Sequence, residues 1–163
     1  MMNYYELFGL TEAPAIDRAD LSKKYFELQK KFHPDFYTNE SEEEKEEALL
    51  QSAAINKAFM IFKDPDKTIE YFLQLKGIIT PDEKYQLPRD FLMEMMELNE
   101  SFDEPGEETK ERITAFESSL AADVSPLLSP EHPGTFAPAE LQQMKAYYYK
   151  KKYLKRILER LDD

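Results

Sequence analysis

The sequence contains no cysteine, and this absence excludes several kinds of chemistry. Without thiols the chain cannot form a disulfide, a thiolate metal site or a cysteine nucleophile. Its two histidines, His33 and His132, lie far apart along the chain. We therefore expect neither a metal centre nor a cofactor.

Long apolar runs are also missing. No stretch of eighteen or more apolar residues occurs, whereas a membrane-spanning helix needs about 20 such residues. The first residues lack the basic segment followed by an apolar one that is typical of a secretory signal peptide. We expect a soluble, cytoplasmic protein with no membrane partner.

Positive charge is outweighed by negative charge. The chain has 21 lysines and arginines against 33 acidic residues, which gives a net charge of -12. Nucleic-acid binding requires clustered basic residues that neutralise phosphates, so this balance argues against a nucleic-acid partner. With 42% apolar residues in 163, the chain can form one or two small helical domains with real cores.

The tripeptide His33-Pro34-Asp35 ends a predicted helix that begins near residue 18. Proline disfavours the helical conformation in the residue before it and has no backbone N–H, so the helix must stop near Phe32 or His33. One side of this helix is an apolar stripe of Leu21, Tyr25, Leu28 and Phe32. A flank of about 120° carries Lys23, Lys24, Lys30 and Lys31, with Asp20 and Glu27 as its only acidic members. A basic helix edge therefore leads into an exposed loop.

A second amphipathic helix is predicted after this loop. The acidic run that starts at Glu42 suits the positive end of a helix dipole. The apolar stripe that follows consists of Ile55, Ala58, Phe59 and Phe62. We expect the two helices to pair antiparallel across the loop that carries His33. A short helix should follow Pro65 and end near Gly77.

The helix predicted over residues 89–104 has two apolar faces. One face carries Phe91, Met95, Leu98 and Phe102, and roughly the opposite face carries Leu92, Met93 and Met96 together with Glu100. A helix in a three-helix domain needs only one face for its core. The second face is therefore either covered by a neighbouring domain or left for a partner, and the periodicity does not choose between them.

The rest of the chain predicts two more helices, over residues 107–122 and from Ala137 onwards. Residues 123–138 between them contain four prolines and one glycine and predict a loop. His132 has no second ligand or base near it in the sequence, so we assign it no chemistry. The terminal helix is basic and residues 90–108 are acidic, so we expect these helices to pack side by side. Nucleic-acid or membrane-surface binding is the rival interpretation, but this helix lacks a broad apolar face free of core contacts.

Several motifs of the first half resemble the J-domain of the HscB family, the co-chaperones of iron–sulfur cluster assembly. They are Leu7-Phe8-Gly9-Leu10, His33-Pro34-Asp35, the run from Gln51 to Phe59, and Lys63-Asp64-Pro65 followed by Glu70-Tyr71. The resemblance implies an all-α protein with two domains. We expect a J-domain over residues 1–76, made of an antiparallel helical hairpin plus short helices. A linker over 77–87 and a C-terminal three-helix bundle over 88–163 should follow.

The resemblance also implies two partners. A J-domain binds an Hsp70 and stimulates its ATPase, and the residues that match this role are His33, Pro34, Asp35, Tyr25, Lys24, Lys30 and Lys31. Positions 26 and 27, basic in other J-domains, are Phe and Glu here. The C-terminal domain of the family binds an IscU-type scaffold protein, and the matching residues are Leu92, Met93, Met96, Glu97, Glu100, Glu104 and Tyr153.

The function implied is delivery of an IscU-type scaffold to a specialised, HscA-like Hsp70, with stimulation of its ATPase, which aids cluster assembly and transfer. An enzyme is not expected, because His33 and Asp35 in one tight turn cannot readily form a nucleophile–base–orienter arrangement. Two alternatives stay open. One is a J-protein with a different client, and the other is a helical adaptor that does not act on an Hsp70.

Overall fold

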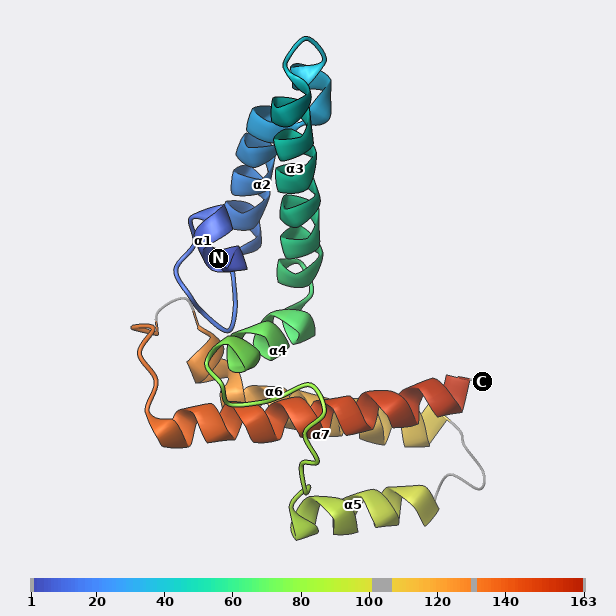
Figure 1. Cartoon of the computed structure of the whole chain (residues 1–163). Helices are drawn as coiled ribbons and strands as arrows, with labels where there is room; N and C mark the ends of the chain where they lie inside the picture. Colours follow the sequence, from blue (N-terminus) through green and yellow to red (C-terminus); the bar gives the residue numbers. More distant parts are fainter. Residues whose placement is uncertain (1, 101–106, 130–131, 163) are drawn as a thin grey trace. The chain divides into compact units, whose positions relative to one another are not determined.

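The computed structural model describes residues 2–100, 107–129 and 132–162, and every regular element in these ranges is a helix (Figure 1). The chain divides into two compact units, Met1–Phe72 and Leu73–Asp163. No helix in the described ranges is both long and apolar enough to cross a membrane. The predicted all-α fold is confirmed.

The first unit is built on an antiparallel hairpin of two helices (Figure 1). Its elements are α1 (Tyr4–Phe8), α2 (Arg18–Phe32), the 3-10 helix η1 (Pro34–Tyr37), α3 (Glu42–Phe62) and most of α4 (Pro65–Leu75). α2 ends where the proline rule predicts, with His33 extended at φ -61° and ψ 131°. Ser41 caps the start of α3, and its hydroxyl accepts a hydrogen bond from the Glu44 N–H at 3.2 Å.

Aromatic rings join α1 to the hairpin. The ring of Phe62 on α3 lies 4.9 Å from that of Tyr5 and 5.8 Å from that of Phe8, measured between centroids. Gly9 ends α1 at φ 66°, a left-handed conformation that glycine adopts without steric cost. The side chains buried along the hairpin are Leu21 of α2 and Ala48, Ser52, Ile55, Ala58 and Phe62 of α3. The other members of the predicted stripes, Tyr25, Leu28, Phe32 and Phe59, are half-buried.

The second unit contains the predicted three-helix bundle. Its helices are α5 (Arg89–Glu100), α6 (Glu107–Leu128) and α7 (Pro138–Asp162), and α6 packs along α7 (Figure 1). All three contribute to one buried cluster, which consists of Phe91, Met95, Leu98, Ile113, Leu154 and Ile157.

The prediction that residues 123–138 are a loop is wrong at its start. α6 continues through Pro126 to Leu128, and the side chains of Val124 and Leu127 are buried. Proline has no N–H, so the carbonyl of Ala122 loses its usual helical donor. The hydroxyl of Ser125 donates to that carbonyl instead, at 3.1 Å. Burial and this substitute bond keep the last turn helical.

The segment before α5 is bonded to α7. The Lys145 ammonium donates to Glu83 Oε1 at 2.5 Å and to the carbonyl of Ile78 at 3.1 Å. The Tyr149 hydroxyl donates to Glu83 Oε2 at 2.8 Å, and its ring stacks on Tyr85 at 4.4 Å. Lys145 of the basic helix thus pairs with Glu83 and not with a carboxylate of α5.

Candidate functional site

The tripeptide lies at the end of the hairpin, where α2 passes into η1 (Figure 1). His33 and Asp35 are exposed, and Pro34 between them is half-buried. The exposed fraction is 46% for the side chain of His33 and 86% for that of Asp35. His33 Nδ1 accepts a hydrogen bond from the backbone N–H of Asp35 at 3.2 Å. The nearest Asp35 carboxylate oxygen is 3.6 Å from Nδ1, beyond hydrogen-bonding distance. The carboxylate therefore does not orient this imidazole as a catalytic base.

Contacts from outside the tripeptide hold the tip in shape. The Tyr37 hydroxyl donates to the carbonyl of Lys31 at 2.7 Å and so closes η1 onto the last turn of α2. The Phe36 ring lies edge-on to the imidazole of His33, with centroids 6.2 Å apart. Sequence reasoning missed Tyr37, because no spacing rule indicates which tyrosine of a loop will reach back to a helix carbonyl.

Tyr25, a predicted Hsp70 contact, is half-buried between α2 and α3. Its ring stacks on Phe59 at 4.1 Å, and its hydroxyl donates to Asn56 Oδ1 at 2.9 Å. Gln29 Nε2 donates to the same oxygen at 3.0 Å. Asn56, which sequence reasoning also missed, thus fixes the register of the two helices just below the tip.

The four lysines on the basic edge of α2 differ in their surroundings. Lys30 and Lys31 are exposed, as is Lys23. Lys24 is half-buried, and its ammonium donates to the carbonyl of Gly9 at 2.7 Å. Lys24 therefore joins α2 to the end of α1, while the other three lysines face solvent.

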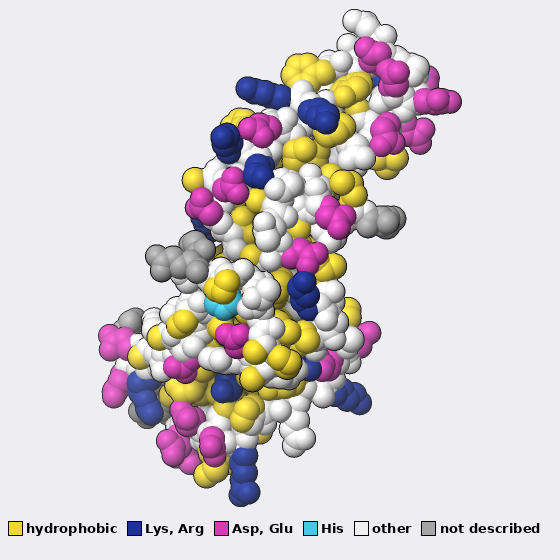
Figure 2. Space-filling model, turned by 90° about the vertical axis from the view of Figure 1, so that its left-hand side faces the viewer, with side chains coloured by type: hydrophobic (Ala, Val, Ile, Leu, Met, Phe, Trp, Pro, Cys, Tyr) yellow, Lys and Arg dark blue, Asp and Glu magenta, His cyan; other side chains and the backbone are white. Residues whose placement is uncertain are grey.

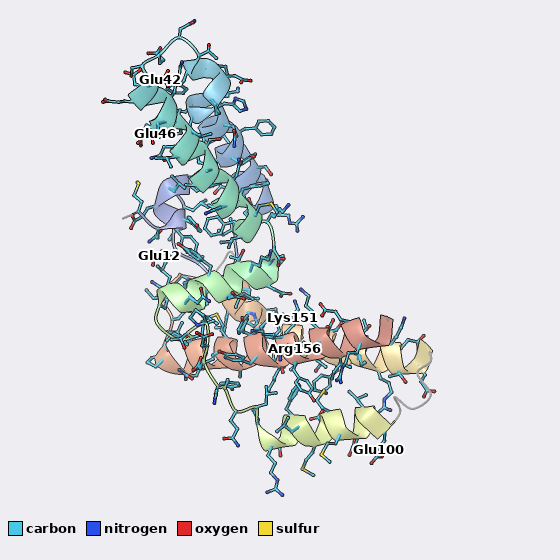
Figure 3. All side chains as sticks on the ribbon, turned by 45° about the vertical axis from the view of Figure 1, so that its right-hand side comes forward. Glu12, Glu42, Glu46, Glu100, Lys151 and Arg156 are labelled. Carbon is cyan, nitrogen blue, oxygen red and sulfur yellow. The ribbon has the colours of Figure 1, made fainter. Side chains whose placement is uncertain are left out.

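The second apolar face of α5 is exposed. We define the outer face of α5 as Leu92, Met93 and Met96, whose exposed fractions are 37%, 55% and 66%. The inner residues Phe91, Met95 and Leu98 are at most 5% exposed. Glu97 is exposed beside the outer face, and Glu100 projects from the end of α5 (Figure 3). Glu104 lies outside the described residues.

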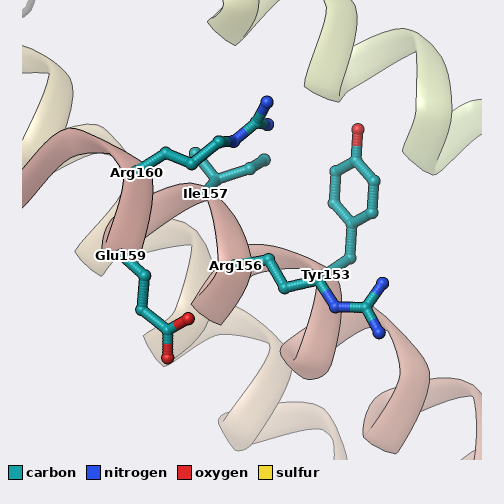
Figure 4. Close-up of a pocket in the computed structure, with 5 residues that line it drawn as sticks. All are labelled: Tyr153, Arg156, Ile157, Glu159 and Arg160. Carbon is teal, nitrogen blue, oxygen red and sulfur yellow. The ribbon is translucent and has the colours of Figure 1, made fainter. Parts of the chain in front are cut away.

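Tyr153 of α7 lies at the edge of the core. Its ring is edge-on to Phe91, with centroids 5.8 Å apart, and its hydroxyl points toward α5 (Figure 4). The residue lines a surface pocket of about 400 Å³. The other lining residues are Arg156, Ile157, Glu159 and Arg160.

His132 takes part in the turn before α7. Its ring stacks on Phe136 at 4.4 Å, Nδ1 accepts from the Gly134 N–H at 3.2 Å, and Nε2 lies 3.7 Å from a Glu140 carboxylate oxygen. Sequence reasoning missed Glu140, which the turn brings back to the ring. Over residues 2–100, 107–129 and 132–162, no three side chains of His, Asp or Glu gather in a way that could hold a metal ion.

Family models match both units. Residues 3–71 match the DnaJ domain, and residues 87–162 match the HSCB C-terminal oligomerisation domain. The two models together span most of the chain.

Curated relatives match this chain over most or nearly all of its length. The co-chaperone protein HscB homolog of Shewanella woodyi is 33% identical over 175 residues, with 99% of this chain and 98% of the relative covered. The homolog of Shewanella halifaxensis is 37% identical over 140 residues, with 80% of each covered.

Solved structures agree as well. The crystal structure of human co-chaperone protein HscB matches with a TM-score of 0.79 and 27% identity, over 99% of this chain and 81% of that chain. The chaperone HscB from Vibrio cholerae matches with a TM-score of 0.65 and 31% identity, over 99% and 96%. These matches confirm the resemblance seen in the motifs, and the chain belongs to the HscB family of J-domain co-chaperones.

Proposed function

We propose that this chain binds an IscU-type iron–sulfur scaffold through the outer face of α5 and delivers it to an HscA-like Hsp70 in the cytoplasm. Its J-domain would stimulate the ATPase of that Hsp70 and so aid cluster assembly and transfer. The observation that carries the proposal is the pair of exposed surfaces on separate compact units, one basic with a polar tip and one apolar with an acidic border.

The tip and the exposed lysines of α2 suit an acidic partner surface. His33 and Asp35 are open to solvent while their backbone is held by the Nδ1 bond and by Tyr37. A preorganised surface loses little conformational entropy on docking. Binding that is tighter to the hydrolysing conformation of the Hsp70 shifts its equilibrium toward that conformation. The catalytic groups belong to the Hsp70, and the co-chaperone supplies differential binding.

The outer face of α5 suits a protein client. Methionine is flexible and polarisable and adapts to an irregular partner surface, and Met93 and Met96 are the most exposed residues of this face. Glu97 and Glu100 would form a charged rim around it. By family resemblance the scaffold-binding set also includes Glu104 and Tyr153.

The Hsp70 part of the proposal is tested with the ATPase of an HscA-like Hsp70. We expect the wild-type chain to raise the hydrolysis rate and His33→Gln to lose this stimulation. His132→Gln is the matched control, because it changes the other histidine, far along the chain, and should stimulate as the wild type does. A helical adaptor would give no stimulation with any variant.

The client part is tested by titrating an IscU-type scaffold. We expect Leu92→Ala combined with Met96→Ala to weaken binding roughly tenfold or more, as loss of central apolar contacts does. Leu49→Ala with Leu50→Ala is the control, since these leucines of α3 are also exposed, at 59% and 61%. Unchanged affinity of the α5 variant would point to a J-protein with another client.

A further inference from the structure

One large aromatic side chain of α2 points away from the core. Phe26 is 67% exposed, while its neighbour Tyr25 stacks on α3 and Leu21 is 2% exposed. Packing of the hairpin therefore does not require an aromatic residue at this position. A single exposed apolar residue is ordinary on a protein surface, so its significance depends on its neighbours.

The neighbours of Phe26 are the exposed parts of the proposed Hsp70 surface. Lys23, Phe26, Lys30 and His33 are spaced by three, four and three residues, which places them within about 80° of one another around the helix. All four are exposed. Along the helix axis, Phe26 thus lies between two lysines and about 10 Å from His33.

The tip carries a second exposed aromatic ring. Phe36 is 65% exposed and touches the imidazole of His33 edge-on. Exposed aromatic residues therefore flank His33 on both sides in the sequence. On the face of this unit drawn in Figure 2, Lys and Arg side chains lie interspersed with hydrophobic ones.

We infer that Phe26 is an apolar anchor of the Hsp70 docking surface, flanked by Lys23 and Lys30, and that the cognate Hsp70 presents an apolar pocket bordered by carboxylates. This inference rests on the proposed Hsp70 function. Interface energy concentrates in central aromatic side chains surrounded by polar groups that exclude water. The lysines call for acidic groups on the partner, and the ring between them calls for an apolar site.

An apolar anchor changes how docking responds to salt. Contacts between exposed charges are screened over about 8 Å at physiological ionic strength, whereas burial of an aromatic ring is not weakened in this way. Docking through Phe26 should therefore retain affinity at salt concentrations that remove the contribution of the lysines.

The test measures half-saturation of ATPase stimulation by the full chain, with a cognate HscA-like Hsp70, at about 0.05 M and 0.3 M salt. We expect Phe26→Ala to need roughly tenfold more protein at both salt concentrations. Phe26→Lys should recover part of the affinity at low salt and lose it at high salt. Met60→Ala, which removes a side chain 50% exposed on α3, is the control and should match the wild type.

The outcomes separate this inference from the function on which it rests. If Phe26→Ala reaches half-saturation at the same concentration as the wild type at both salt concentrations, Phe26 is not an anchor. The proposed Hsp70 function is then unaffected. A wild-type chain that fails to stimulate at either concentration overturns both. Melting curves of Phe26→Ala should match those of the wild type, because the ring is exposed, and would reveal any loss of folding.

Discussion

At the scale of single residues, two hydrogen bonds hold the tip of the J-domain in shape, one within the tripeptide and one outside it. The hydroxyl of Tyr37 holds the carbonyl of Lys31, and His33 Nδ1 holds the N–H of Asp35. Both bonds leave the imidazole and the carboxylate exposed. The tip is therefore ordered before a partner arrives, which lowers the entropic cost of docking.

Tyr37→Phe, which keeps the ring and removes the hydroxyl, should weaken docking to the Hsp70. One hydrogen bond contributes a net free energy of about 1 kcal/mol, so the apparent affinity for the Hsp70 should fall roughly fivefold. Half-saturation of ATPase stimulation measures the change. Tyr148→Phe, on α7 in the other compact unit, is the control. Equal half-saturation for Tyr37→Phe and the wild type would show that the bond does not preorganise the tip.

A second residue-scale prediction concerns Glu83 and pH. Hydrogen bonds from Lys145, then from Tyr149, lower the pKa of the Glu83 carboxyl in the folded protein. Because the folded pKa lies below the unfolded value of about 4.3, the contribution to stability is complete above that pH. It is lost as pH falls through the folded pKa.

The measurement is the free energy of unfolding of the second unit between neutral pH and about pH 3. Glu83→Gln should lower stability at neutral pH and make the loss on acidification shallower. Asp82→Asn changes the adjacent, exposed carboxylate and should leave the slope near that of the wild type. Parallel curves for Glu83→Gln and the wild type would contradict the prediction.

At the scale of helices, α5 places two adjacent methionines in different environments, one in the core and one on the surface. Met95 is 1% exposed and belongs to the bundle core, whereas Met96 is 66% exposed on the outer face. A turn of 100° per residue is enough to put neighbouring side chains in different environments. The two methionines therefore offer a chemically matched comparison.

We predict that Met95→Ala destabilises the second unit by about 2–5 kcal/mol, because it leaves a cavity in a packed core. Met96→Ala should change stability by about 0.5 kcal/mol or less, as surface substitutions do. Urea denaturation followed by circular dichroism measures both. A similar loss for the two variants would mean that the outer face of α5 is also part of a packed interface.

At the scale of the whole molecule, the two proposed surfaces belong to different compact units. The tip lies in Met1–Phe72 and the outer face of α5 lies in Leu73–Asp163, and each unit has its own buried core. Substitutions at exposed positions of units with separate cores usually have additive effects on stability. The two binding activities should therefore be separable.

We expect each variant to lose one of the two activities and to keep the other. His33→Gln should bind the scaffold with wild-type affinity and fail to stimulate the Hsp70 ATPase. Leu92→Ala with Met96→Ala should stimulate the ATPase normally when no scaffold is present and bind the scaffold weakly. Calorimetry and the ATPase assay measure the two quantities, and a loss of both activities in either variant would argue against independent surfaces.

The sequence by itself determined the features of this protein that depend on local rules. Proline stops α2 next to His33 because its ring restricts the preceding residue. The period of the α-helix sorts the side chains of α5 into an inner and an outer face before any packing is known. The motifs around these residues were enough to identify the family.

Tertiary structure alone decided which distant groups meet. It kept Pro126 inside α6, because buried neighbours and the Ser125 hydroxyl compensate for the missing N–H. It joined Glu83 to Lys145 across 62 residues, and Asn56 to Tyr25 across 31. Such contacts depend on how helices pack in space, and helical period and turn chemistry carry no information about that packing beyond the few residues they span.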